Sequence, residues 1–413
     1  MRPGSFCKAL FVSAFASLFS LMAHAQAELL SRAEDAPLTI RSLNADAERP
    51  IIANDGSFVI YSSQADNVIT PTGSASPQLP SFFRMYLYDR VEDQTTALVP
   101  EANGSSVALA LFNNNRELIF SSSATNLTEE AGNSPRLYSL IIETGVVSEF
   151  ASEPTLDNTQ LLLSPDATTI VRAVENNNGG WQLDIFDRAT NRSRFIAVGA
   201  NAPLTLQAFS GDSNWLAFAS EATNLTDDTV DGDNNFYLVD LRNDSLSLLP
   251  VNLLRRERIE ALSNDGQKVL LYQLGDFPTG LFDDFPRDIR DRITPVGWIV
   301  YDRITGALEP LLIGRADTTD RFLNMSPDAR FFTFAQFENI NNFEGGRLVH
   351  YDRLTDRSIE VVGDGQQFLF DLTPLEPMSA DGRWVVFPSH ANDLIDNDYS
   401  EDEQIYLLSL IHI

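Results

Sequence analysis

The chain has 413 residues, a formal net charge of −29 at pH 7 and a single cysteine, Cys7. A surface this acidic repels nucleic acids and anionic lipids, because both are bound through clusters of lysine and arginine. One cysteine excludes an intrachain disulfide, so the fold must depend on a buried apolar core.

The first 25 residues are typical of a secretory signal peptide. Arg2 and Lys8 precede an apolar run over residues 9–22, and Ala-His-Ala at residues 23–25 places small side chains at a cleavage site. A membrane span needs about 20 apolar residues, more than this run supplies. The sequence therefore predicts cleavage after Ala25, a periplasmic or secreted protein, and no membrane span.

A turn followed by an apolar strand recurs seven times along the rest of the chain. Each turn holds an aspartate or asparagine, as in Ser-Asn-Asp-Gly (263–266) and Ser-Ala-Asp-Gly (379–382). These residue types favour tight β-turns. Recurrence at this spacing indicates repeated supersecondary units. The seven turn residues are Asp55, Asn114, Asp166, Asp212, Asp265, Asp328 and Asp381.

Further strands complete each unit. Six residues after the turn, five copies have an aromatic residue, which is predicted to pack between neighbouring sheets, and the other two have Arg172 and Leu271. A strand that usually ends in Asp-Arg and a short outer strand follow. Four strands in about 50 residues match the size of a propeller blade. The aromatic residues are Tyr61, Phe120, Phe218, Phe334 and Phe387.

The sequence thus predicts an all-β fold, a seven-bladed β-propeller of four-stranded antiparallel blades in a single domain over residues 26–413. The last unit lacks an outer strand, so the N-terminal segment Leu38–Leu43 is predicted to pair with the last blade and close the ring. The blades are expected near residues 50–99, 104–152, 160–199, 204–252, 259–313, 321–363 and 372–413.

These repeats resemble the TolB-like family of bacterial propeller repeats. The residues that carry the resemblance are Ser326-Pro327-Asp328 with Phe334, the turn at residues 379–382 with Phe387, and the Asp-Ile-Phe-Asp strand at residues 184–187. The resemblance covers residues 38–413. It implies the propeller fold and does not fix a function, because one fold serves many functions.

A second recurring motif joins the second and third strands of four units. It reads Ser-Ser-Ala-Thr-Asn-Leu-Thr at residues 122–128 and Ser-Glu-Ala-Thr-Asn-Leu-Thr at residues 220–226. Its recurrence indicates a structural role, in which the Asn and Thr side chains bond to the backbone of their loop.

A densely acidic loop follows the second of these motifs. Ca²⁺ prefers six to eight oxygen ligands from carboxylates, amides and carbonyls, on a loop that glycine lets turn sharply. The sequence therefore offers a candidate Ca²⁺ site, with a solvated acidic loop as the alternative. The candidate ligands are Asp227, Asp231, Asp233 and Asn235.

The fifth unit carries an insertion over residues 275–297. Long loops in compact domains are often functional, and aromatic and arginine side chains favour the centres of interfaces. A partner-binding or lid role is one hypothesis for this insertion, and a self-packed loop is the other. The candidate binding residues are Phe277, Phe282, Phe285, Arg287 and Arg290.

Signals for catalysis are poor. Outside the signal peptide the only histidines are His350, His390 and His412, and His350 is predicted to be structural because it lies within a strand. The sequence favours a non-enzymatic, monomeric binding or scaffold protein that recognises an envelope protein or glycan on an acidic propeller face. Ca²⁺ at the candidate site would assist this binding. The alternative is a hydrolase or lyase that uses channel carboxylates on an extracellular polysaccharide or peptide.

Overall fold

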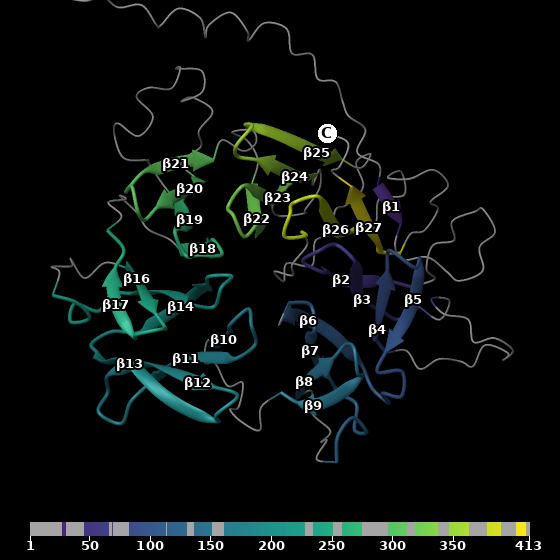
Figure 1. Ribbon diagram of the computed structural model, residues 1–413, viewed down its shortest axis with the longest axis horizontal. Coiled ribbons are helices and arrows are strands. Elements are labelled where there is room, and N and C mark those ends of the chain that lie inside the picture. The colour runs from purple at the N-terminus through teal and green to yellow at the C-terminus, as the bar shows by residue number, and fades with distance from the viewer. Residues whose placement is uncertain are drawn as a thin grey trace, which may run out of the picture.

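The computed structural model describes residues 27–29, 45–65, 68, 82–112, 114–129, 136–150, 161–227, 234–250, 258–274, 296–311, 319–337, 347–362, 378–389 and 402–409. These residues form an all-β propeller, in which the sheets surround a common centre (Figure 1). The first strand of each four-stranded sheet lies towards the centre and the last strand lies outermost. Among the described residues, no helix is long and apolar enough to cross a membrane.

Consecutive strands pair antiparallel within each four-stranded sheet, in chain order. The first sheet consists of β2 (Ala47–Ile52), β3 (Phe58–Ser63), β4 (Arg84–Asp89) and β5 (Gln94–Leu98). The second consists of β6 (Ser106–Phe112), β7 (Glu117–Ser122), β8 (Arg136–Ile141) and β9 (Val146–Glu149). The third consists of β10 (Leu161–Leu163), β11 (Thr169–Glu175), β12 (Trp181–Asp187) and β13 (Arg192–Ala200).

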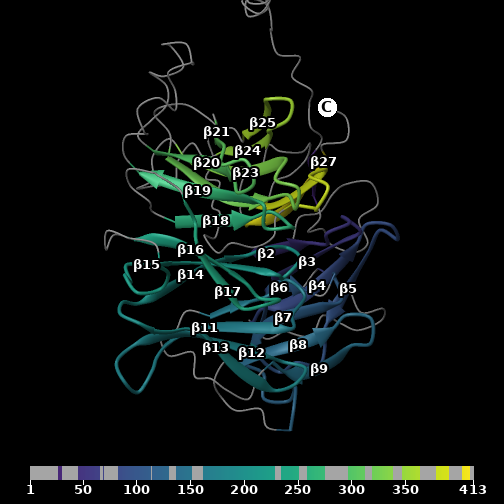
Figure 2. The same cartoon turned by 60° about the vertical axis from the view of Figure 1, so that its left-hand side comes forward.

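Three more four-stranded sheets follow along the chain. The fourth consists of β14 (Leu204–Phe209), β15 (Trp215–Ser220), β16 (Asn235–Asp240) and β17 (Ser245–Leu248). The fifth consists of β18 (Arg258–Leu262), β19 (Lys268–Leu274), β20 (Val296–Asp302) and β21 (Leu308–Leu311). The sixth consists of β22 (Thr319–Met325), β23 (Phe331–Phe337), β24 (Arg347–Asp352) and β25 (Arg357–Val362). Turned by 60°, the fifth, fourth and third sheets lie face to face (Figure 2).

The prediction of seven four-stranded blades is wrong, because the described residues form six. The seventh turn leads into a three-stranded sheet of β26 (Trp384–Ser389), β27 (Gln404–Ser409) and β1 (Ala27–Leu29). At the position of a first strand, the described residues show only a single bridge between Met378 and Val385. A copy of the turn therefore did not guarantee a complete blade.

The segment that pairs with β27 also differs from the predicted one. Ala27 lies opposite Leu408 and Leu29 opposite Tyr406, so β1 is the partner, and it lies beside β27 in Figure 1. Residues 38–43, the predicted closing strand, lie outside the described part of the chain. The Leu-Thr-Ile-Arg-Ser-Leu run has the stronger strand pattern, whereas the short Ala-Glu-Leu of β1 gives almost no signal in the sequence.

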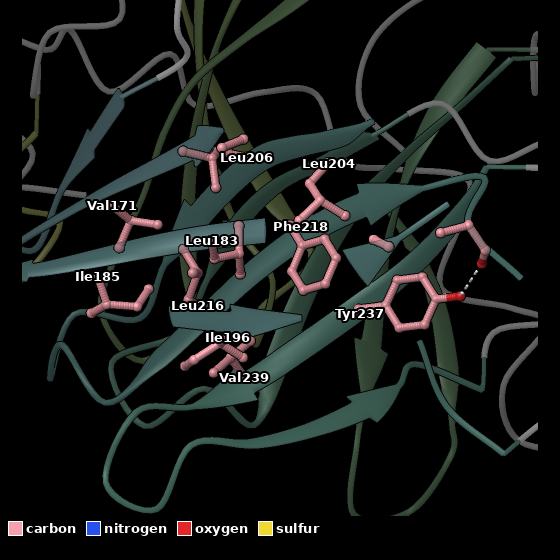
Figure 3. Close-up of a cluster of buried hydrophobic side chains, with 13 residues drawn as sticks. Val171, Leu183, Ile185, Ile196, Leu204, Leu206, Leu216, Phe218, Tyr237 and Val239 are labelled. Atoms are coloured by element: carbon pink, nitrogen blue, oxygen red, sulfur yellow. Dashed lines mark hydrogen bonds between the residues drawn. The ribbon is translucent and has the colours of Figure 1, made fainter. Parts of the chain in front are cut away.

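The core lies between neighbouring sheets, and we call each such interface a seam. In the seam between the third and fourth sheets, Phe218 of β15 stacks on Tyr237 of β16 with ring centroids 5.3 Å apart (Figure 3). Both rings pack against Leu183 and other residues of the third sheet. The Tyr237 hydroxyl donates to the Ala222 carbonyl oxygen at 3.1 Å, which satisfies its buried polar atom. The predicted packing of aromatic residues between sheets is confirmed.

The last position of each tight turn meets the preceding sheet. Gly266 has a φ of +67°, and a Cβ placed there would lie 2.4 Å from the Trp215 side chain at the start of β15. Gly56 and Gly382 meet Trp384 and Phe331 in the same way. The third and sixth sheets have alanine at this turn position, Ala167 and Ala329, each with a positive φ. The second strands of the sheets before them begin with Glu117 and Lys268, which have no aromatic ring. At Gly56, Gly266 and Gly382 the ring of the neighbouring sheet thus leaves no room for a Cβ.

We expect Gly266→Ala to destabilise the protein more than Gly306→Ala. Both glycines have positive φ, so both substitutions incur the left-handed strain of about 1–2 kcal/mol. No atom lies within 4 Å of a Cβ at Gly306, whereas the methyl group at Gly266 must displace Trp215, which adds about 1–3 kcal/mol. Urea unfolding of both variants measures the difference, and equal losses would contradict the steric explanation.

Candidate functional site

The two ends of the propeller carry different connections. Because each sheet is antiparallel in chain order, the turns between its first and second strands and between its third and fourth strands share one end, the turn end. The loops between second and third strands and the connections to the next sheet share the other, the loop end.

At the turn end, the recurring serine and aspartate hold the tight turns. Ser210 Oγ donates to Asp212 Oδ1 at 2.5 Å and accepts from the Trp215 amide at 2.9 Å. Burial raises the pKa of Asp212, but hydrogen bonds from Ser210 and Asn214 outweigh it, so the pKa is lowered overall. The same Ser–Asp bond recurs in four other turns, with Ser164–Asp166, Ser263–Asp265, Ser326–Asp328 and Ser379–Asp381.

The Asp-Arg pair at the end of the third strand is also structural. Asp302 Oδ1 accepts the amides of Ile304 and Thr305 at 2.8 and 3.1 Å, which shapes the hairpin. Arg303 donates to the Gly266 carbonyl oxygen at 2.7 Å, and its guanidinium lies 4.0 Å from the centre of the Trp215 ring. The arginine therefore joins the turn of its own sheet to the preceding sheet.

At the loop end, the second recurring motif clamps the connections between sheets. Asn201 donates its backbone amide to Asn224 Oδ1 at 3.0 Å and its side-chain amide to Thr223 Oγ1 at 2.9 Å. Asn224 Nδ2 donates to the Gly199 carbonyl oxygen at 2.9 Å. Asn103, Thr125 and Asn126 repeat this arrangement. The predicted structural role is confirmed, but the predicted partner is wrong, because the motif's asparagine side chains bond the backbone of the incoming connection. The loop's own amides at Thr125 and Thr223 donate to Asn103 and Asn201 of that connection.

A different group of side chains lies on the fifth sheet at the loop end. Arg258 begins the innermost strand β18 and donates from Nε to Glu260 Oε1 at 2.6 Å. Its guanidinium carbon lies 4.8 Å from the centre of the half-buried Tyr272 ring, which stacks on Trp298 at 5.4 Å. The Arg258 side chain is 53% exposed, in contrast to 14% for Glu260. The cluster presents a cation over an aromatic ring to solvent.

A β-bulge places Glu260 within this cluster. The pairing of β18 with β19 shifts between Ile259 and Ala261, so Glu260 is the extra residue. In β14 the corresponding shift leaves Gln207 unpaired, and its Oε1 accepts the Ile259 amide at 2.9 Å. Bulges on inner strands re-aim side chains and are common near functional sites.

The predicted Ca²⁺ site is described only at its edges. Asp227 is exposed after β15, and Asn235 is buried at the start of β16. Asp231 and Asp233 lie outside the described residues. Within the described ranges, no three His, Cys, Asp or Glu side chains lie close enough to hold a metal ion. Ca²⁺ binding remains a prediction.

The predicted partner-binding insertion also lies outside the described residues, with Phe277, Phe282, Phe285, Arg287 and Arg290. His350 is described, and its structural role is confirmed. It is 4% exposed, its Nδ1 lies 3.1 Å from Thr333 Oγ1, and its ring stacks on Phe331. Burial lowers the pKa of His350 to about 4. The imidazole is therefore neutral at pH 7 and is shielded from solvent.

Comparisons with known proteins bear on the fold. No family model matches the sequence, and no curated protein matches it. An oligogalacturonate lyase in complex with manganese is 13% identical with a TM-score of 0.54, covering 94% of this chain and 93% of that chain. The oligogalacturonate lyase of Vibrio parahaemolyticus is 12% identical with a TM-score of 0.53, covering 93% and 96%. TolB from Acinetobacter baumannii is 14% identical with a TM-score of 0.42, covering 80% and 66%.

The resemblance to TolB-like propellers is confirmed for the fold. The Ser-x-Asp turns that carry the resemblance form the tight turns of successive sheets in a propeller, as the resemblance implies. At these identities, the likeness to the lyases likewise establishes the fold and not an activity.

The sequence missed the cluster around Arg258. Arg258 and Glu260 are two residues apart in a strand whose bulge is not visible in the sequence, and Tyr272 becomes their neighbour only through the pairing of β18 with β19. The available signal was the pair of large aromatic residues, Tyr272 and Trp298, on the two strands that flank the insertion.

The side chains of His350 and Asp352 should each make the free energy of unfolding depend on pH, over different pH ranges. Because the neutral form of His350 is favoured in the fold, its contribution is complete above about pH 6.5 and is lost as the pH falls towards 4, by about 3 kcal/mol. Arg330 donates to both Asp352 carboxylate oxygens and lowers the pKa of Asp352 to about 2. That contribution is complete above about pH 4 and is lost between about pH 4 and 2.

Urea unfolding at a series of pH values tests this separation. We expect His350→Gln to flatten the dependence between pH 6.5 and 4. Asp352→Asn should flatten the dependence below pH 4 and deepen the loss of stability above it, because the Asp352 carboxylate raises the pKa of His350 against the larger effect of burial. An unaltered slope above pH 4 in His350→Gln would show that His350 is not the group responsible.

Proposed function

We propose that this protein is an exported binding propeller that recognises an envelope protein or glycan at its loop end, around Arg258, Glu260 and Tyr272. The observation that carries the proposal is the position of Arg258. This residue lies on the innermost strand β18, and its exposed guanidinium lies over the half-buried ring of Tyr272 on β19. Arginine and tyrosine are the residues most enriched at the energetic centres of interfaces.

The contrast with other arginines supports this choice. Arg188 and Arg303 donate to carbonyl oxygens of their own turns, and each lies over an aromatic ring of the preceding sheet. Their side chains are committed to the fold. Arg258 has five N–H donors and uses one of them on Glu260 within the described structure. Its remaining donors suit the carbonyl, carboxylate or hydroxyl oxygens of a partner.

The acidic composition also fits binding at the loop end. The turn-end aspartates Asp166, Asp212 and Asp302 accept hydrogen bonds from their own turns. The candidate Ca²⁺ ligands stand in the sequence between β15 and β16, a connection of the loop end, so a bound Ca²⁺ would belong to the same end as Arg258. The predicted signal peptide supports an envelope or extracellular location for such a partner.

The proposal is tested with immobilised protein, using envelope extract and a glycan array as two sources of partners. We expect Arg258→Ala and Tyr272→Ala to weaken retention of the captured partner by at least about tenfold, because each removes a side chain from the interface centre. Each assay is run with Ca²⁺ and with a chelator. A Ca²⁺ requirement would support the predicted loop site as part of the interface.

Arg383→Ala is the matched control. It removes the same charge from an exposed arginine, 64% exposed, that lies in a turn at the opposite end. Retention unchanged in the Arg258→Ala and Tyr272→Ala variants, or reduced equally in Arg383→Ala, would contradict the proposed site. Circular dichroism of all three variants confirms that they are folded.

The alternative function is that of a lyase or hydrolase acting on an extracellular polysaccharide or peptide. The observation in its favour is the match in fold to oligogalacturonate lyases over nearly the whole chain. Glu48 and Glu260 are inner-strand carboxylates, and both lie beside an arginine of their own strand, at 3.9 and 2.6 Å. Each of these carboxylates is thus already paired with a cation of its own strand, which favours the binding function.

Incubation with polygalacturonate and Mn²⁺, with chromatography of the products, tests this alternative. The binding function predicts no turnover by the intact protein. Turnover that is lost in Glu260→Gln but retained in Arg383→Ala would instead favour the enzyme and place Glu260 in its site.

A further inference from the structure

Hydrogen bonds between turns link most neighbouring sheets at the turn end. Ala380 of the last turn donates to the Asn54 carbonyl oxygen at 2.8 Å, and Asn54 donates to Asn115 Oδ1 at 2.9 Å. The third to sixth sheets are joined in the same way, by Asp166 to Ser213, Asp212 to Asn264 and Asn264 to Pro327. Across the described turns, no such bond joins the second sheet to the third or the sixth sheet to the last.

The seam between the second and third sheets also has the smallest apolar core. Its fully buried cluster consists of Ile119, Phe150 and Ile170. The clusters in five other seams each contain nine or more buried residues. The remaining apolar side chains of this seam are only partly buried, namely Phe112, Leu137, Leu161, Leu163 and Phe186. Apolar burial is the main attraction between sheets, so this seam is the weakest of those described.

Charged groups occupy the place of the missing core. In four other sheets, an aromatic pair such as Phe218–Tyr237 faces the preceding sheet. In the third sheet, the corresponding register pair is Arg172 opposite Asp184, and these two side chains form an ion pair. Asp184 is 5% exposed, and its Oδ1 has no hydrogen-bond partner among the residues that the structure describes. A buried carboxylate oxygen without a partner is costly.

A second ion pair crosses the seam itself. Arg188 of the third sheet donates to Glu117 Oε1 of the second at 3.0 Å, and Ser139 donates to the same oxygen at 2.6 Å. The Arg188 guanidinium lies 4.6 Å from the centre of the Phe150 ring. These contacts hold the sheets together, but the charged groups regain hydration when the sheets separate, which offsets much of the loss.

We propose that the seam between the second and third sheets is a joint at which the propeller opens, while the five seams with larger buried clusters stay closed. Opening there separates β6–β9 from β10–β13 and exposes the innermost strands β6 and β10 at the central channel. The inference does not depend on the identity of a partner, because it follows from the relative strength of the seams.

Hydrogen exchange followed by mass spectrometry tests the opening. We expect the amides of β7, β8, β11 and β12 to exchange through a local opening. Their exchange rates should therefore hardly change at low urea concentrations. Amides of β15 and β16, at the strong seam between the third and fourth sheets, should exchange only through an opening whose rate rises with urea. Equal urea dependence in both regions would overturn the proposal.

A repaired seam provides the decisive variant. Arg172→Phe combined with Asp184→Tyr installs the aromatic pair found in the other sheets, and we expect it to slow exchange across this seam by about tenfold. Arg172→Phe alone leaves Asp184 buried without its cation and should speed exchange there. Tyr237→Phe, in the neighbouring seam, is the control and should leave exchange between the second and third sheets unchanged.

Exchange across the second-to-third seam that is the same in wild type and in the double variant would also contradict the proposal. If the double variant fails to fold, Arg188→Lys serves instead. It keeps the charge but loses the planar guanidinium over Phe150, so it should speed exchange at this seam alone.

Discussion

The arrangement of the sheets depends on the arginine that ends the third strand. Arg303 donates to the carbonyl oxygen of Gly266 and lies over Trp215 of the preceding sheet, and Arg90 repeats both contacts with Gly56 and Trp384. One side chain therefore fixes a turn and also sets the position of that turn on its neighbour. The close approach that results leaves no space for a Cβ at these turns, which explains their glycine.

This constraint changes the meaning of the acidic composition. An aspartate in most turns and hairpins accepts backbone amides, so part of the negative charge follows from repeating the same unit. Those carboxylates are bonded at the turn end and are poor candidates for a partner site. The loop end differs, because there the cation of Arg258 remains exposed over Tyr272. The repeat thus separates a structural end from an end with groups available for binding.

The repeat made the propeller predictable, and departures from the repeat were not. Turn residues and the aromatic residues six positions later identify the sheets and their packing, because these contacts are set by local sequence. The number of complete blades was not predictable, since a turn before β26 does not reveal that the described residues before it form only the bridge at Met378. The sequence showed that Arg172 replaces the aromatic residue found in other repeats. It did not show that Asp184 is its partner, because that pairing depends on the register between β11 and β12.

A ring made from one chain is usually suspected to be weakest where its ends meet, but here that junction is reinforced. Ala47 donates to the Glu403 carbonyl oxygen at 2.8 Å, and the Glu403 amide donates to Asp46 Oδ1 at 2.9 Å. Val386, Ile405 and Leu407 share a buried cluster with the first sheet. Because the junction of the chain ends has both a core and hydrogen bonds, the weakest seam can lie between two sheets that are consecutive in the chain. Opening there leaves the pairing of the termini intact, so the ring can close again without a search for its ends.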